Sequence, residues 1–216
     1  MKPNISIILP VINCESFIYE SINSLLCQTY DNFELIIIID PSIDDTLRII
    51  QNIEDPRIII IKNKKRLGLA ESLNIGINNA RGIYIARADG DDISFPNRLA
   101  VQLEYIKKMD VDLVGSKYIN EYIQNGEIKQ NNSRLCEPST TRAHMFFYWI
   151  THGTLMFKRK IITDLKSVYI DRPAEDYNLF VRLAKKYKFY DIPEVLVKVR
   201  VRNDSLCGKS WNLIKN

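Results

Sequence analysis

The chain has 216 residues, of which 46% are hydrophobic and 26% are charged, the composition of a soluble globular protein with room for one domain. The formal net charge of +4 allows an anionic ligand but is too small to indicate binding to nucleic acid. The four cysteines form no CxxC pair and have no zinc-site spacing with the two histidines, so reduced structural thiols are expected.

The N-terminal stretch MKPNISIILP is too short, and too soon interrupted by Pro10, to be a signal peptide. The longest apolar runs, LIIII and MFFYWI, have the size of strands and fall short of the roughly 20 residues that a membrane-spanning helix needs. The sequence therefore predicts a cytoplasmic protein. Its mild positive charge leaves open a peripheral contact with the inner face of a membrane, and oligomer formation is left open as well.

The first half of the chain alternates between two kinds of element. Short runs rich in β-branched residues predict buried strands, and apolar residues at helical spacing predict the helices between them. Strands that are hydrophobic on both faces and separated by helices indicate a parallel sheet covered on both sides. The predicted strands are 5–9, 33–39, 57–62 and 82–88, and the predicted helices are 15–28, 42–53 and 69–80.

The second half mixes its elements differently. Pro96 marks the opening of a helix predicted within 92–109. We expect the elements that follow to be α+β structure added to the side of the first sheet, within a single domain. They are a strand at 111–123, a loop or hairpin at 124–141, a strand at 151–159, a helix at 174–187 and a half-exposed strand at 194–202.

Three carboxylates gather in the stretch ARADGDDIS, at the end of the fourth predicted strand. Asp89, Asp91 and Asp92 are close enough to raise one another's pKa unless a positive group lies among them. Arg87 could supply that charge, although the alternation of the strand does not fix its direction. Parallel sheets bind ligands at the carboxyl ends of their strands, which brings Asp40 to the same edge.

The chemistry of this cluster has two interpretations. Oxygen ligands without histidine suit Mg²⁺ or Mn²⁺ shared with the phosphates of a substrate, and Gly90 would let a ligand approach closely. Alternatively, the cluster is a solvated turn in which Asp92 caps the next helix. Its place at the ligand-binding edge favours the first interpretation.

Motifs spread over nearly the whole chain combine into one pattern. They are ISIILPVINCE, SLLCQTYDNFELIIIIDPSIDDT, GLAESLNIGINNARGIYIARADGDDISFPNRL and AEDYNLFVRL. In order and spacing, from about Ile5 to Ser205, they resemble the family-2 glycosyltransferases. The resemblance implies the GT-A fold, with a Rossmann-like, mostly parallel central sheet flanked by helices and a smaller acceptor-side α+β portion. It also implies a nucleotide-sugar-binding half at 1–110, an acceptor-side half at 111–205 and a tail at 206–216.

The resemblance implies a role for individual residues. Asp40 would accept a hydrogen bond from the nucleotide base, and Asp91, with Asp89 at the ribose and metal, would hold Mn²⁺ or Mg²⁺ against the diphosphate. Asp176 would be the catalytic base, giving inversion at the anomeric carbon. An ordinary helix N-terminus is the alternative for the AEDY stretch. The implied donor-site residues are Pro10, Val11, Ile12, Asp40, Arg66, Asp89, Gly90 and Asp91, and the acceptor-side residues are His152 and Glu175.

Several positions depart from the pattern of the family. Ile12 stands where an aromatic residue is common, and Ile39 replaces the first of two acids at the end of the second strand. Gly153 replaces a proline after His152, which leaves the role of the histidine open. Arg202 stands where a histidine is common, and arginine cannot ligate a metal.

Two functions follow from the pattern, with a third ranked last. The first is a metal-dependent, inverting enzyme that moves a sugar from a UDP-sugar to a glycan or glycolipid, as in polysaccharide biosynthesis. The alternative is a nucleotide-sugar-binding protein of the same fold with weak or lost transferase activity. For Arg66, two roles are open: it could contact the diphosphate of the donor, or it could be a charged side chain exposed to solvent. A nucleotidyltransferase is ranked last because PVINCES lacks a glycine-rich phosphate loop.

Overall fold

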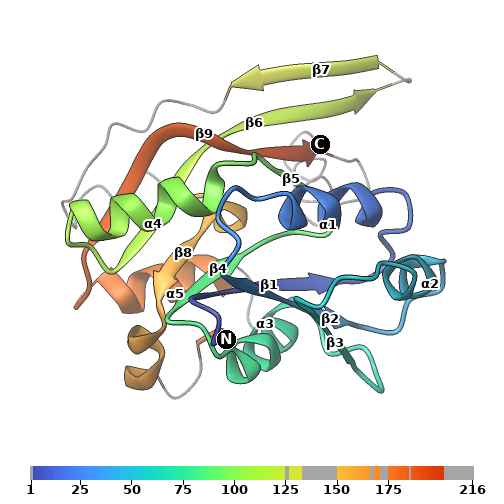
Figure 1. Ribbon diagram of the computed structural model, residues 1–216, viewed down its shortest axis with the longest axis horizontal. Helices are drawn as coiled ribbons and strands as arrows, with labels where there is room; N and C mark the ends of the chain where they lie inside the picture. The colour runs from blue at the N-terminus through green and yellow to red at the C-terminus, as the bar shows by residue number, and fades with distance from the viewer. Residues whose placement is uncertain are drawn as a thin grey trace, which may run out of the picture.

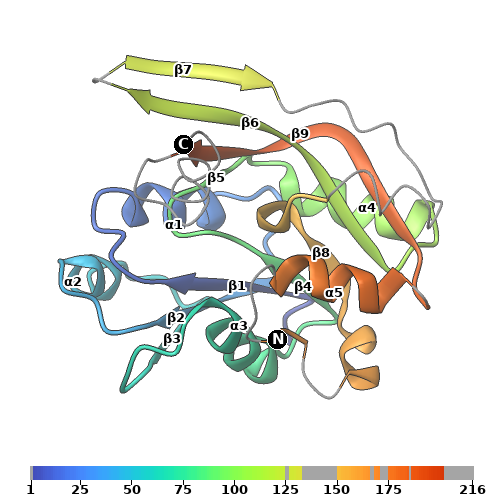
Figure 2. The ribbon, with the colours of Figure 1, turned by 180° about the vertical axis from the view of Figure 1, so that it is seen from behind.

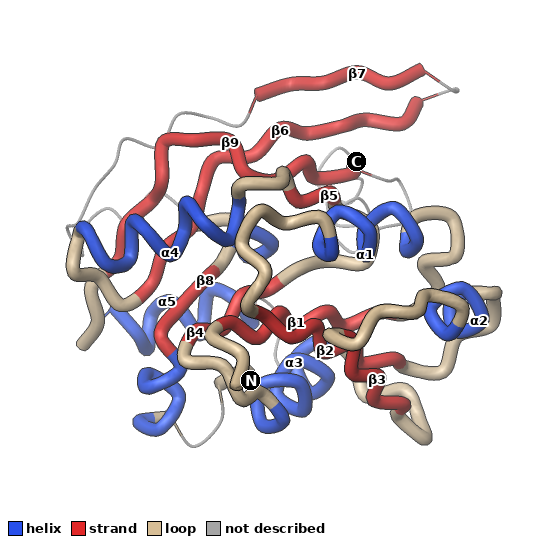
Figure 3. Tube along the Cα trace, viewed as in Figure 1, coloured by secondary structure: helices blue, strands red, loops and turns tan. Residues whose placement is uncertain are grey.

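The structure, a computed structural model, describes residues 2–124, 127–132, 150–165, 168–170, 175–184 and 186–201. Their strands join into one sheet that runs through the molecule (Figures 1 and 3). The strands are β1 (Ile5–Val11), β2 (Phe33–Ile39), β3 (Ile58–Lys62), β4 (Tyr84–Arg87), β5 (Ile93–Ser94), β6 (Leu113–Gln124), β7 (Glu127–Asn132), β8 (Met156–Lys158) and β9 (Phe189–Val201).

Helices cover both faces of this sheet, with α1, α2 and α4 packed on one face and α3 and α5 on the other (Figures 1 and 2). None of the described helices combines the length and apolar character needed to cross a bilayer. The α-helices are α1 (Ile18–Leu26), α2 (Thr46–Gln51), α3 (Leu69–Asn79), α4 (Arg98–Lys108) and α5 (Glu175–Ala184), and the 3₁₀ helices are η2 (His152–Thr154) and η3 (Arg159–Asp164).

The strand order is β3-β2-β1-β4-β8-β6-β9-β5, with β7 paired to β6 outside this path. The pairings among β1, β2, β3 and β4 are all parallel, as the first half of the sequence predicts. Strand β8 then joins β4 in the antiparallel sense, and β6 pairs antiparallel with β8 and parallel with β9. The later strands therefore continue the first sheet. The division of the chain near residue 110 stays a prediction.

The continuous hydrophobicity of β1 and β2 follows from burial on both faces. Ile7 and Ile37 pack in the cluster under α1, α2 and α4, whereas their neighbours Ile8 and Ile38 pack in the cluster under α3 and α5. Because successive side chains of a strand point to opposite faces, both helix layers are anchored on the same two strands. Because both faces of these strands are covered by helices, the carboxyl ends of the strands are the part of the sheet open to a ligand.

Three sequence-based expectations need correction or refinement. The strand predicted at 151–159 is wrong over its first part, because η2 occupies His152–Thr154 and only Met156–Lys158 is extended. A helix was expected within 92–109, but β5 comes first and α4 begins at Arg98. Of the loop or hairpin expected at 124–141, β6 and β7 form the hairpin; residues 133–141 lie outside the described residues.

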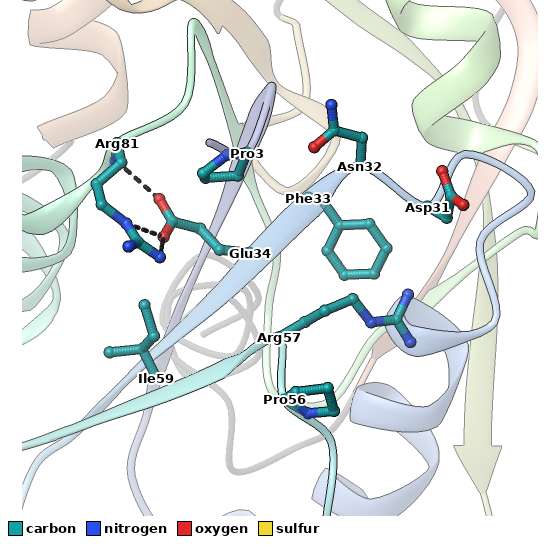
Figure 4. Close-up of a pocket in the computed structure, with 9 residues that line it drawn as sticks. All are labelled: Pro3, Asp31, Asn32, Phe33, Glu34, Pro56, Arg57, Ile59 and Arg81. Atoms are coloured by element: carbon teal, nitrogen blue, oxygen red, sulfur yellow. Dashed lines mark hydrogen bonds and ion pairs between the residues drawn. The ribbon is translucent and has the colours of Figure 1, made fainter. Parts of the chain in front are cut away.

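The amino edge of the sheet contains a hollow of about 370 Å³, far along the strands from the predicted site (Figure 4). Glu34, at the start of β2, accepts hydrogen bonds from the Ser6 hydroxyl at 2.6 Å and from the Arg81 N–H and Nε at 2.8 Å each. Burial would raise the pKa of Glu34, but the Ser6 and Arg81 hydrogen bonds outweigh it and lower that pKa. The ionised carboxylate thus joins β1, β2 and the turn before β4.

We expect Glu34→Gln to lower the free energy of unfolding at neutral pH by about 1–3 kcal/mol, because an amide satisfies these donors poorly. The pKa of Glu34 is lower in the folded than in the unfolded chain, so its stabilisation is present above the unfolded pKa and is lost as pH falls through the folded pKa. The difference from the wild type should therefore shrink in acid. Urea unfolding across pH measures it, with exposed Glu54→Gln as control; an equal loss in both variants would contradict the account.

Candidate functional site

The parallel strands deliver their following residues to one edge, as the sequence predicts. The Asp40 N–H donates to the Val11 carbonyl at 3.1 Å, and the Asn63 N–H donates to the Ile39 carbonyl at 2.9 Å. The Ala88 N–H donates to the Ile8 carbonyl at 3.0 Å, which carries the β1 pairing past the end of β4. The segments after β1, β2, β3 and β4 therefore begin side by side.

Asp40 holds the loop that follows β3. One carboxylate oxygen accepts from Asn63 Nδ2 at 2.7 Å, and the other accepts from the N–H groups of Leu67 and Gly68 at 3.1 and 2.9 Å. Gly68 has a φ of 85°, a conformation that favours glycine. The buried carboxylate thereby sets the path of the loop that presents exposed Arg66 at this edge. A nucleotide base would share the Asp40 oxygens with the loop.

The counter-charge of the acidic cluster lies inside the protein. The guanidinium of Arg87 forms an ion pair with the Asp89 carboxylate, which settles the direction that strand alternation leaves open. The Arg87 side chain is only 6% exposed. Burial would lower the pKa of Arg87, but the charge and hydrogen bond of Asp89, together with Tyr169 and the charge of Asp92, outweigh it and raise that pKa. Asp89 is therefore neutralised by a group that stays charged at every physiological pH.

Asp92 is buried and receives one backbone hydrogen bond. Its Oδ1 accepts from the Arg200 N–H at 3.0 Å. Burial raises the pKa of Asp92 well above its usual value, and the charges of Asp89 and Asp91 add to the effect. The alternative in which Asp92 caps the next helix is wrong, because the N-cap of α4 is Asn97 and β5 intervenes.

The turn itself is packed tightly against the start of α1. A side chain at Gly90 would come within 3.0 Å of Val11 Cγ1 and 3.2 Å of Cys14 Sγ, so the glycine admits these neighbours. The Ser21 hydroxyl donates to the Asp89 carbonyl at 2.9 Å. The expected role of Gly90 in letting a ligand approach stays a prediction. The close packing of Val11 and Cys14 is by itself a reason for glycine at this position.

Arg98, to which no sequence motif assigns a role, lies beneath the cluster. This fully buried arginine donates from Nη1 to Ser94 Oγ at 2.9 Å. Its Nη2 donates to the carbonyls of Arg87 and Gly153 at 2.6 and 3.0 Å. Burial lowers the pKa of Arg98 to about 10, so it remains charged at neutral pH.

His152 lies under the same cluster. Its Nε2 is 2.7 Å from the hydroxyl of Tyr169, and both side chains are buried. Burial, with a smaller effect of Arg87, lowers the pKa of His152 well below its usual value, so the ring is neutral. Because the ring is buried, neutral and hydrogen-bonded to Tyr169, it is better suited to holding neighbouring residues in place than to making a charged contact with an acceptor. The predicted acceptor role of His152 stays a prediction.

Asp176 and Glu175 stand half-buried at the start of α5, where the sequence predicts them. Asp176 Oδ1 accepts from the Tyr177 N–H at 2.7 Å. Burial raises the pKa of Tyr169, while Arg87 opposes the effect and the charges of Glu175 and Asp176 add to it. One tyrosine therefore lies within electrostatic reach of both the acidic cluster and the start of α5.

The oxygen atoms of the acidic cluster could coordinate a cation only together with oxygen atoms of a bound substrate. No group of three histidine, cysteine, aspartate or glutamate side chains capable of holding a metal occurs in the part of the chain that the structure describes. The cluster nevertheless offers only oxygen donors, and Mg²⁺ is commonly held by one or two carboxylates plus substrate phosphates. The chemistry therefore fits a cation that binds together with a diphosphate. Arg202 lies outside the described residues.

Comparisons with known proteins found related sequences. Residues 6–165 match the family model described as Glycosyl transferase family 2. The chain is 36% identical to the putative glycosyltransferase EpsE of Bacillus subtilis, covering 97% of this chain and 77% of that protein. It is 34% identical to the Escherichia coli UDP-Glc:alpha-D-GlcNAc-diphosphoundecaprenol beta-1,3-glucosyltransferase WfaP, covering 84% of this chain and 70% of that protein.

Solved structures share the fold at lower identity. Staphylococcus aureus TarS 1-349 in complex with UDP-GlcNAc has a TM-score of 0.80 and 20% identity, covering 94% of this chain and 60% of that chain. The mannosyltransferase PcManGT from Pyrobaculum calidifontis, in complex with GDP-Man and Mn²⁺, has a TM-score of 0.73 and 19% identity, covering 100% and 61%. The chain thus spans about three fifths of these solved chains.

Gly153 offers a direct test of the packing around the cluster. An added methyl group would lie 2.9 Å from Asp89 Oδ2 and 3.2 Å from both Arg87 Nη1 and Asp92 Oδ2. We expect Gly153→Ala to lower the free energy of unfolding by about 1–3 kcal/mol through overpacking. The loss should be smaller in an Asp89→Ala background, which lacks the nearest atom. Urea unfolding measures both; equal losses in the two backgrounds would show that the carboxylate is not the obstacle.

Proposed function

The chain belongs to glycosyltransferase family 2, and from this premise we propose that it transfers a sugar from a UDP-sugar to a hydroxyl of a glycan or glycolipid, with inversion. The observation that carries the proposal is the position of Tyr169. Its hydroxyl lies 2.7 Å from Nε2 of His152, whose neighbour Gly153 packs against Asp89. Arg182 of α5 donates to the carbonyl of Val168, the residue before Tyr169. A leaving-group site and a base site are therefore within reach of one substrate.

The donor site is proposed at the carboxyl edge of β1 and β2. Pro10, Val11 and Ile12 would line the base, Asp40 would accept from its N–H, and Arg66 would meet the diphosphate. The exposed position of Arg66 on the loop held by Asp40 supports this assignment. UDP as the nucleotide is supported by the name of the Escherichia coli relative.

Mn²⁺ or Mg²⁺ would be held by Asp91, with Asp89 and Gly90 beside it. Bound there, the cation supplies Lewis-acid stabilisation of the charge on the departing diphosphate. Within the chain, the ion pair with Arg87 fixes the direction of the Asp89 carboxylate, which suits a carboxylate that orients the ribose. The complex of the mannosyltransferase PcManGT with GDP-Man and Mn²⁺ supports the same class of cation.

Asp176 is proposed as the base that removes the proton of the acceptor hydroxyl while the bond to the diphosphate breaks. Its carboxylate is partly exposed, and its Oδ1 accepts from the Tyr177 N–H at the start of α5. Glu175 would contact the acceptor, and His152 would orient Tyr169 from below. Attack from the face opposite the diphosphate gives inversion in a single displacement.

The acceptor is proposed to be a glycan or a lipid-linked sugar, which would bring the protein to a membrane surface. The name of the Escherichia coli relative includes an acceptor sugar attached to diphosphoundecaprenol. A binding protein with lost turnover is the alternative. The intact set Asp40, Asp89, Asp91 and Asp176 favours the enzyme.

The proposal is tested by incubating UDP-sugars and GDP-mannose with the protein, in Mn²⁺ or in EDTA, and measuring release of the nucleotide. We expect metal-dependent release from a UDP-sugar. Asp176→Asn should lower turnover by about 10²–10⁴-fold, because the acceptor loses its base, while UDP affinity changes little.

Glu175→Gln is the matched control, because it removes the neighbouring carboxylate of α5 and should affect mainly the acceptor KM. Full turnover in Asp176→Asn would remove that residue from its role. UDP binding without turnover of any donor would favour the binding protein instead.

A further inference from the structure

Arg200, on the last strand β9, reaches the acidic turn from the opposite end of the chain. Its Nη1 donates to the Asp91 carbonyl at 3.3 Å, and its backbone N–H donates to Asp92 Oδ1 at 3.0 Å. The side chain is 6% exposed. A single buried residue therefore holds both the backbone and a side chain of the turn.

The guanidinium is fixed on its other sides by carboxylates. Nε donates to Glu121 Oε2 at 3.1 Å, and Nη2 pairs with Glu20 on α1. The second oxygen of Glu121 binds Lys198 Nζ at 3.0 Å. Burial would raise the pKa of Glu121, but the hydrogen bonds from Lys198 and Arg200 outweigh it and lower that pKa. The guanidinium carbon also lies 5.3 Å from the ring centre of Phe17.

These contacts suit arginine and no other residue. The planar fork presents donors in several directions at once, so Arg200 can bind Glu20, Glu121 and the Asp91 carbonyl together. A lysine has the same charge but a single ammonium group, which cannot span the three partners. The arrangement therefore fixes the position of the carbonyl as well as supplying charge.

The turn is held at both of its ends. Ser21 binds the Asp89 carbonyl at 2.9 Å, and Arg200 binds the Asp91 carbonyl. With both carbonyls fixed, the backbone from which the Asp91 side chain projects is held by α1 on one side and by β9 on the other. Strand β9 thus takes part in the geometry of the donor site.

We propose that Arg200 is a positioning residue that fixes the Asp91 carboxylate for the cation shared with the donor diphosphate. This inference rests on the proposed function. Arg200 touches neither donor nor acceptor in this role; it acts through the backbone of the turn. The residue is distinct from Arg202, which stands where the family commonly has a histidine.

The test compares UDP affinity in saturating Mn²⁺ with UDP affinity in EDTA, by calorimetry, and takes the ratio as the gain due to metal. Arg200→Lys should lower this gain by about tenfold, the lower end of the effect of losing a group that orients a metal ligand. UDP affinity in EDTA should stay within about twofold, since Arg200 does not touch the base. A merely structural role would lower thermal stability and leave the gain unchanged.

Lys198→Met is the matched control, because Lys198 binds the same Glu121 without touching the turn. In this variant Mn²⁺ should increase the affinity for UDP by the same factor as in the wild type. Glu20→Gln provides a second variant, since the Glu20 side chain is 64% exposed and its replacement leaves the core intact. It should lower the gain in the same direction by a smaller factor.

A gain equal to that of the wild type in Arg200→Lys and in Glu20→Gln would overturn the role of Arg200 alone. Absence of any gain in the wild type would overturn the proposed metal-dependent function, and this inference with it.

Discussion

The structure depends on the neutralisation of a crowded group of carboxylates at one edge of a buried sheet. Asp89, Asp91 and Asp92 lie within a single turn, and such proximity is unfavourable unless positive groups compensate it. The compensation is internal: Arg87 pairs with Asp89, and Arg200 binds the backbone of the turn and Asp92. A cation that arrives with a diphosphate would therefore meet a turn that is already organised.

Buried arginines around the same turn also connect the two halves of the chain. Arg98 binds the carbonyls of Arg87 and Gly153, which joins the end of β4 to η2. Arg200 brings β9 onto the turn, and the absence of a side chain at Gly153 lets the second half approach the carboxylates. The second half of the chain thus helps to support the acidic turn of the first half, and a substitution in one half should affect the stability of the other.

The sequence was sufficient to predict the parallel part of the fold and the edge on which the acids gather. Four apolar runs separated by helices leave few alternatives, and parallel strands end at a common edge. It was insufficient for the arginines, because contacts between Arg98 and Gly153 or Arg200 and Asp91 join residues 55 and 109 positions apart. No local pattern reports such pairings.

The short elements β5 and η2 could not be predicted from the local sequence either. β5 has two residues and forms only because β9 lies beside it, so the residues around position 93 indicate no more than the approach to a helix. The helical turn at His152 interrupts a stretch whose alternation predicts a strand. In both places, tertiary pairing decides the conformation over local propensity.

The most direct test of the central claim is calorimetric titration of UDP into the wild type and Asp91→Asn, each with Mn²⁺ and with EDTA. The account predicts tighter binding in Mn²⁺ for the wild type and loss of that gain in Asp91→Asn, because the amide is a poor ligand for the cation. Asp31→Asn, an exposed residue at the opposite edge, serves as control. A gain that persists undiminished in Asp91→Asn would contradict the account.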